Sequence, residues 1–111
     1  DAQVIAVGAN SAATTAMLKA GADAAATGEN PVVVNSQDAD VILGPMGILT
    51  ANALLGEITP AMAAAVSDSR AQKVLIPANR CSVTVVGVEQ LPLGEYVRLA
   101  VLAAKEALEE A

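Results

Sequence analysis

The sequence predicts an α/β protein, a Rossmann-like three-layer sandwich built on a mainly parallel sheet of four or five strands. Short aliphatic runs alternate along the chain with alanine-rich amphipathic stretches, which is typical of successive strand–helix units. The aliphatic runs at 4–7, 24–26, 41–43 and 74–76 each end in a small polar cluster, as strands do at the carboxyl edge of a parallel sheet. At 111 residues the chain is expected to form a single α/β domain, 1–111.

The first half of the chain predicts two strand–helix units in succession. Residues 3–8 form the first strand, after which Asn10 or Ser11 caps a helix that runs through Lys19. Residues 23–27 form a strand that is weak by propensity, because alanine favours helices. We accept this strand from its position between two helical stretches.

The next stretch carries conflicting signals. Glu29 favours the positive end of a helix dipole, and Pro31 is tolerated in a first helical turn. Three consecutive valines at 32–34 favour a strand instead. We interpret 29–37 as a short helix with a strand as the rival, followed by a buried strand at 40–44.

The second half continues the alternation. The remaining expected elements are a turn at 44–47, a helical turn at 51–55, a helix from Thr59-Pro60 to about Ser69, strands at 73–77 and 83–88, and a helix at 93–111. The last helix has the clearest pattern, because its apolar residues share a stripe and its glutamates lie outside that stripe.

The composition excludes several functions. A net charge of −6 and the lack of stacking aromatics, with Tyr96 as the single aromatic residue, exclude a nucleic-acid partner. No apolar run approaches the roughly 20 residues of a membrane span, and no secretory leader is visible, so we expect a cytoplasmic protein without a membrane partner. The single Cys81 fits a reducing compartment.

The absence of histidine removes Ser-His and Cys-His catalysis and imidazole metal sites. We therefore expect no metal, and the sequence indicates no particular cofactor. Cys81 as a nucleophile lacks an activating histidine, and a lone cysteine is more often a small buried hydrophobe.

The polar clusters at the strand ends are expected to line one ligand pocket, because ligands bind outside the carboxyl ends of strands in open α/β sheets. The candidate ligand-binding residues are Asn10, Ser11, Thr27, Gly28, Glu29, Asn30, Gly44, Pro45, Gly47, Asn79 and Arg80. Helix capping is the alternative role for five of them, namely Asn10, Ser11, Thr27, Glu29 and Asn30. The alternative for the residues at 44–47 is that they simply form a turn. Arg80 is a candidate clamp for a phosphate or carboxylate, and Glu57 is a candidate general base or a capping group.

Several segments together resemble an uncharacterised bacterial family, the domain of unknown function 3842 (DUF3842). The segments that carry the resemblance are 6–10, 16–22, Ala-Thr-Gly-Glu-Asn at 26–30, 44–48, Leu-Gly-Glu-Ile-Thr-Pro at 55–60 and 76–79. The similarity covers roughly residues 3–100. It implies an α/β fold and no mechanism.

Members of that family typically begin with one more βα unit, whose glycine-rich turn resembles a dinucleotide-binding loop. The present sequence has no Gly-x-Gly-x-x-Gly, and its first strand matches the second strand of the family. The resemblance therefore implies that residues 1–111 lack the phosphate cradle at a helix amino terminus. Because Arg80 is then the best remaining anion contact, we expect weak dinucleotide binding by this chain.

Three functions fit the sequence. The leading interpretation is a small cytosolic Rossmann-like protein that binds a nucleotide or another small polar metabolite at the carboxyl edge of its sheet. The second is a small enzyme that uses Glu29, Glu57 or Cys81, and the third is a structural or oligomerisation module without a ligand. A homo-oligomer is expected in each case, because the chain is 54% hydrophobic and needs cover for an exposed strand edge or helix face.

Overall fold

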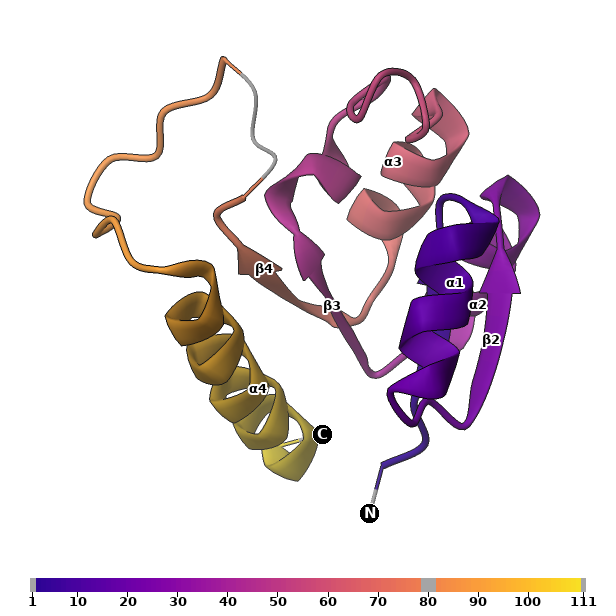
Figure 1. Ribbon diagram of the computed structural model, residues 1–111, viewed down its shortest axis with the longest axis horizontal. Helices are drawn as coiled ribbons and strands as arrows, with labels where there is room; N and C mark the ends of the chain where they lie inside the picture. The colour runs from indigo at the N-terminus through magenta and orange to yellow at the C-terminus, as the bar shows by residue number, and fades with distance from the viewer. Residues whose placement is uncertain (1, 79–81, 111) are drawn as a thin grey trace.

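The computed structural model describes residues 2–78 and 82–110 of an α/β protein (Figure 1). Its elements are β1 (Ile5–Gly8), α1 (Ser11–Lys19), β2 (Ala24–Thr27), α2 (Glu29–Asp38), β3 (Val41–Pro45), the 3-10 helix η1 (Met46–Leu49), α3 (Pro60–Asp68), β4 (Gln72–Ile76) and α4 (Leu93–Glu110). The predicted alternation of strands and helices is confirmed.

The described strands form two parallel pairs. In one sheet β1 pairs with β2, with Ile5 opposite Ala24; in the other β3 pairs with β4, with Val41 opposite Gln72. The expected single sheet of four or five strands is not formed by these residues. Aliphatic runs predict strands, and their alternation with helices predicts that the strands are parallel, whereas the pairing of sheet edges depends on distances between elements that no local pattern encodes.

The strand predicted at 83–88 is absent. Residues 82–92 are irregular, and the segment turns at Gly87, whose φ of 85° lies in the left-handed region. Alternating valines form a stable strand only when another strand pairs with them, and no described strand pairs with this segment.

Local sequence signals correctly predicted where helices α1, α2 and α3 begin. The Asn10 side chain accepts a hydrogen bond from the Ala13 amide at 2.9 Å and so caps α1, and Thr59 caps α3 in the same way through the Met62 amide at 3.2 Å. The valines at 32–34 are helical within α2, so the start signals at Glu29 and Pro31 outweigh β-branched propensity. The helix predicted at 29–37 is confirmed.

The segment between β3 and α3 differs from expectation. The predicted turn at 44–47 is divided between the end of β3 and η1, and the predicted helical turn at 51–55 is a series of tighter turns. Asn52, Leu54 and Leu55 have φ values of 66°, 56° and 56°. Left-handed leucines are uncommon because the side chain crowds the backbone, and no sequence signal announced them.

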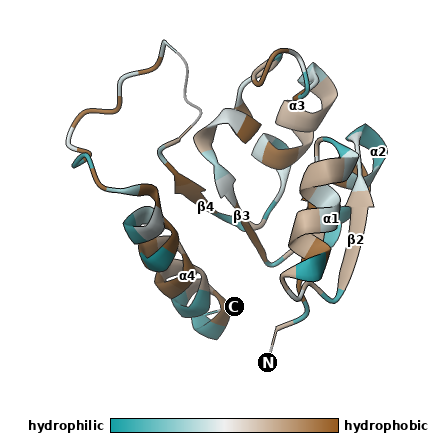
Figure 2. Cartoon of the chain, viewed as in Figure 1, coloured by the Kyte–Doolittle hydropathy of each residue, from teal (hydrophilic) through white to brown (hydrophobic). Residues whose placement is uncertain are grey.

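The main core lies where η1, the loop after it and α3 meet. Ala53, Ile58, Met62 and Ala63 form the buried cluster, and partly buried Ala9, Val32, Ile48 and Leu54 pack against it. Helix α4 packs separately against β3 and β4 through a face that buries Ala100. Figure 2 shows hydrophobic and hydrophilic residues alternating around this helix, as its predicted amphipathic pattern requires.

Candidate functional site

Polar side chains from the ends of β1 and β2 lie close together. Asn10 follows β1 and caps α1, Thr27 ends β2, and Glu29 begins α2. Parallel pairing in register, with Gly8 opposite Thr27, places the two strand ends at the same edge of the sheet. Asn10 and Thr27 therefore lie at the same edge of the sheet, as predicted.

Two hydrogen bonds connect this edge to the segment that follows β3. The Asn10 side-chain amide donates to a Glu57 carboxylate oxygen at 3.2 Å, and the Thr59 hydroxyl donates to a Glu29 carboxylate oxygen at 2.5 Å. Asn10 and Glu29 belong to the β1–β2 half, whereas Glu57 and Thr59 lead into α3. We call Asn10, Glu29, Glu57 and Thr59 the carboxyl-edge cluster.

A pair of threonines fastens α1 to the end of β2 directly beside the cluster. The Thr27 hydroxyl donates to the Thr14 hydroxyl at 2.7 Å. The Thr14 hydroxyl in turn lies 3.1 Å from the Asn10 carbonyl oxygen and 3.3 Å from that of Ala26. The Thr27 hydroxyl thus already has a structural partner, and its main effect is to hold the backbone that carries Asn10.

The amino termini of three helices meet at the cluster. Asn10 is the N-cap of α1, Glu29 lies in the first turn of α2, and Thr59 is the N-cap of α3. The positive ends of the helix dipoles favour the negative charges of Glu29 and Glu57 at this position. Asn10, Glu29 and Glu57 are exposed, so the two carboxylates can accept hydrogen bonds from hydroxyl or amino groups that approach from solvent.

The other predicted site residues divide into three groups. Ser11 and Asn30 are exposed in the first turns of α1 and α2, and Gly28 is the N-cap of α2. The residues of the turn at 44–47 serve packing: Gly44 and Gly47 are buried, and Pro45 ends β3. A side chain at Gly44 would lie 3.0 Å from the Ile48 side chain. Asn79, Arg80 and Cys81 lie outside the described residues.

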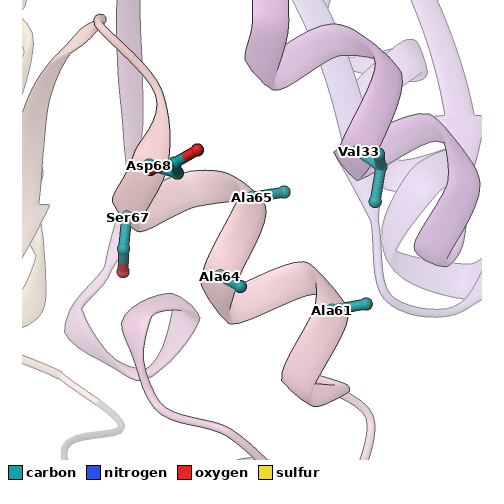
Figure 3. A pocket seen from close by; sticks show the side chains of 6 residues that line it. All are labelled: Val33, Ala61, Ala64, Ala65, Ser67 and Asp68. Atoms are coloured by element: carbon teal, nitrogen blue, oxygen red, sulfur yellow. The ribbon is translucent and has the colours of Figure 1, made fainter.

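A hollow in the surface lies elsewhere. It has a volume of about 560 Å³ and is lined by residues of α2 and α3 that Figure 3 shows, namely Val33, Ala61, Ala64, Ala65, Ser67 and Asp68. Methyl groups dominate this lining, and a site for a polar ligand needs several convergent polar groups. The hollow also runs along the side of α3 and not across the strand ends, so the carboxyl-edge cluster remains the better candidate.

Two other features are absent from the part of the chain that the structure describes. Within residues 2–78 and 82–110, no three His, Cys, Asp or Glu side chains gather in a way that could hold a metal ion. No helix in the same ranges is long and apolar enough to cross a membrane.

Sequence reasoning missed two members of this arrangement. The sequence gives Thr14 no role, and it indicates Thr59 only as a helix cap. A signal for Thr59 was available, because a helix after a parallel strand begins at the carboxyl edge of the sheet and its N-cap lies there as well. Thr14 offered no comparable signal, since its role depends on the close approach of α1 to β2.

The fold and the cluster define an α/β protein with acidic and amide side chains gathered at the carboxyl ends of its parallel strands. Over residues 1–109 the chain matches the family model described as Domain of unknown function (DUF3842), and it belongs to that family. No curated protein and no solved structure matches the chain. The predicted family resemblance is confirmed.

Proposed function

We propose that the protein binds a small polar metabolite, such as a nucleotide, at the carboxyl-edge cluster. The observation that supports this most directly is the pair of hydrogen bonds from Asn10 to Glu57 and from Thr59 to Glu29. They join the strand ends of the β1–β2 half to the segment that leads into α3, and the carboxyl ends of the strands are where open α/β sheets bind ligands.

The charge of the cluster favours one part of such a ligand. Two carboxylates accept hydrogen bonds from vicinal hydroxyls or from an amino group, whereas they repel a free phosphate. The ribose diol of a nucleoside or nucleotide therefore fits the Glu29 and Glu57 side of the cluster. The Asn10 amide supplies a donor for a neighbouring carbonyl or ring nitrogen.

We also propose that the two parallel pairs are halves of one Rossmann-like sheet, because all four strands are parallel within their pairs and helices alternate with them. We place the protein in the cytoplasm of a bacterium. The single cysteine fits a reducing compartment, and the resemblance to a bacterial family supports the source.

Calorimetric titration of the chain with ribose, adenosine, AMP and NAD tests the ligand proposal. We expect heat of binding with at least one ribose compound and about tenfold weaker binding by Glu57→Gln, because one charge-assisted hydrogen bond contributes about 1.5 to 3 kcal/mol. Glutamine retains an oxygen that accepts from Asn10, so this variant removes the charge while it preserves the local contact.

Glu106→Gln is the matched control, because it removes the same charge from an exposed position of α4. We expect this variant to bind the ligand as tightly as the wild type. The proposal is wrong if none of the four compounds binds, or if the Glu57 and Glu106 variants bind them equally well.

The enzyme interpretation stays a prediction. Glu29 and Glu57 both lie at the carboxyl edge, where an acid or a base would act on a bound ligand. Cys81 lies outside the described residues. Turnover of a ligand that the titration identifies, with loss of turnover in Glu57→Gln at saturating ligand, would favour an enzyme over a binding protein.

A further inference from the structure

Within residues 2–78 and 82–110, strand β1 is paired along one edge only and has one free edge. The Ala24 amide donates to the Val4 carbonyl at 3.3 Å, and the Gly28 amide donates to the Gly8 carbonyl at 3.0 Å. Residues of a parallel strand bond alternately to the two sides, so the even-numbered residues of β1 face β2. The backbone N–H and C=O groups of Ile5 and Val7 therefore point to the side where β1 has no partner strand.

Strand β3 has a free edge of the same kind. The Gln72 amide donates to the Asp40 carbonyl at 3.1 Å, and Val41 lies opposite Gln72 in the ladder. Ile42 and Gly44 therefore face β4, while Val41 and Leu43 direct their backbone groups to the unpaired side.

These two free edges belong to neighbouring parts of the molecule. Ala9, directly after β1, and Ile48, shortly after β3, pack against the same buried cluster in α3 and the loop before it. The hydrogen bond from Asn10 to Glu57, at 3.2 Å, also joins the end of β1 to the segment between η1 and α3. In Figure 1, β2 lies at one side of the molecule and α4, which covers β4, at the other. The edges of β1 and β3 are therefore the inner ones.

The side chains at the inner edges are also incompletely covered. Ile5 is 46% exposed and Leu43 is 45% exposed, although both lie in the middle layer of an α/β protein. Strands of parallel sheets are normally buried on both faces by helices. Two-stranded sheets are, moreover, marginally stable in isolation, and three or more strands are usual.

We propose that the inner edges of β1 and β3 receive one extended aliphatic polypeptide segment, which runs parallel to both strands. The resulting sheet has the order β2–β1–segment–β3–β4. The segment matches the four residues of β1 and the five of β3 in length. It is rich in valine and isoleucine, because helices would cover both of its faces. This inference rests on the proposed Rossmann-like sheet and is independent of the proposed ligand.

Residue-resolved amide hydrogen exchange of the 111-residue chain tests the inference. The probe is a synthetic nine-residue peptide, Lys-Lys-Val-Ile-Val-Ile-Val-Lys-Lys, whose lysines oppose the net charge of −6 and keep the peptide dissolved. At saturating peptide we expect at least tenfold slower exchange of the amides of Ile5, Val7 and Leu43. The amides of Lys73 and Leu75 point to the outer side of β4 and should not change.

A second peptide with proline in place of the two isoleucines is the matched control, because proline donates no backbone hydrogen bond and is excluded from central strands. It should leave every rate unchanged. Three outcomes would overturn the inference: no slowing at the inner edges, equal slowing at Lys73 and Leu75, or inner-edge protection without peptide that grows with protein concentration. The last outcome would assign the edges to a second copy of the chain. None of these measurements involves Glu57 or a ribose compound, so the ligand proposal stands or falls separately.

Discussion

Gly8 shows how a single missing side chain sets the geometry of the site. It is buried at the end of β1, and a Cβ atom there would lie 2.2 Å from the Thr14 hydroxyl oxygen and 2.6 Å from the Thr14 amide nitrogen. Real Cβ atoms do not approach other atoms so closely, and backbone cannot yield as the tip of a flexible side chain does. Gly8 therefore allows α1 to begin against the strand, which places Asn10 at the edge.

We expect Gly8→Ala to lower the free energy of unfolding by about 1 to 3 kcal/mol, the usual cost of overpacking. Urea denaturation measures this change. Gly94→Ala is the control, because a Cβ at Gly94 meets no atom within 4 Å and alanine favours the α4 helix. That substitution should stabilise the protein by up to about 1 kcal/mol. Equal stability of Gly8→Ala and the wild type would contradict the close approach.

The site residues show what a sequence can and cannot predict at this scale. Asn10 and Thr59 were recognised as caps, because capping depends on residues within one helical turn. Their partners Glu57 and Glu29 were recognised as polar residues near strand ends. The pairing itself joins residues 47 and 30 positions apart, so it depends on how the two halves pack and on nothing in the local pattern.

Among the elements, α4 offers a test of local electrostatics. Arg98 donates two hydrogen bonds to the carboxylate of Glu95, with distances of 3.1 Å from Nε and 2.5 Å from Nη2. These hydrogen bonds and the positive charge of Arg98 lower the pKa of Glu95, and the same hydrogen bonds together with the negative charge of Glu95 raise the pKa of Arg98. The pKa of Glu95 is lower in the folded protein than in the unfolded chain. The contribution of the pair to stability is therefore fully present at a pH above the pKa of the unfolded chain, and it is lost as the pH falls through the pKa of the folded protein.

We expect Arg98→Gln to raise the pKa of Glu95, measured by NMR titration of its side-chain carboxyl carbon. Lys105→Gln removes the same charge farther along the same helix and should leave the Glu95 midpoint where it is. An unchanged midpoint in Arg98→Gln would mean that the bidentate pair does not persist in solution.

The structures of two valine-rich segments show which kinds of element the sequence could predict. Residues 32–34 form part of a helix despite their strand propensity, because a glycine, a glutamate and a proline around residue 30 fix the start of α2. Residues 83–88 form no strand, although their alternation favoured one. Helix starts are encoded within a few residues, whereas a strand requires an edge that other parts of the chain must provide.

At the scale of the whole molecule, composition predicted the character of the core better than its arrangement. The sequence lacks phenylalanine and tryptophan, and no large side chain of the described residues is fully buried. The core cluster accordingly contains two alanines besides Ile58 and Met62. The division into two sheets was not predicted, because alternation indicates parallel strands without indicating which edges meet.

Because this core is small, aliphatic side chains remain exposed on α4. Val97, Val101 and Leu108 are 43%, 41% and 37% exposed, and their spacing of four and seven residues places them along one side of the helix. This side continues the face that packs on β3 and β4. We therefore expect two copies of the chain to associate through α4, with a two-fold axis that brings the same stripe of each copy together.

Sedimentation equilibrium over a wide concentration range measures this association. Val101→Lys should weaken it by about a hundredfold, because each copy loses about 1.5 kcal/mol of apolar burial and a two-fold interface contains the residue twice. Leu102→Lys is the matched control: Leu102 is 47% exposed but lies about 100° around the helix from Val101, outside the stripe, so its replacement should leave the dimer intact. A wild-type monomer at every concentration, or equal effects of the two lysines, would contradict dimerisation through this stripe. Association through α4 also leaves the inner strand edges free, so the exchange of the Ile5 and Leu43 amides should not slow as the dimer forms.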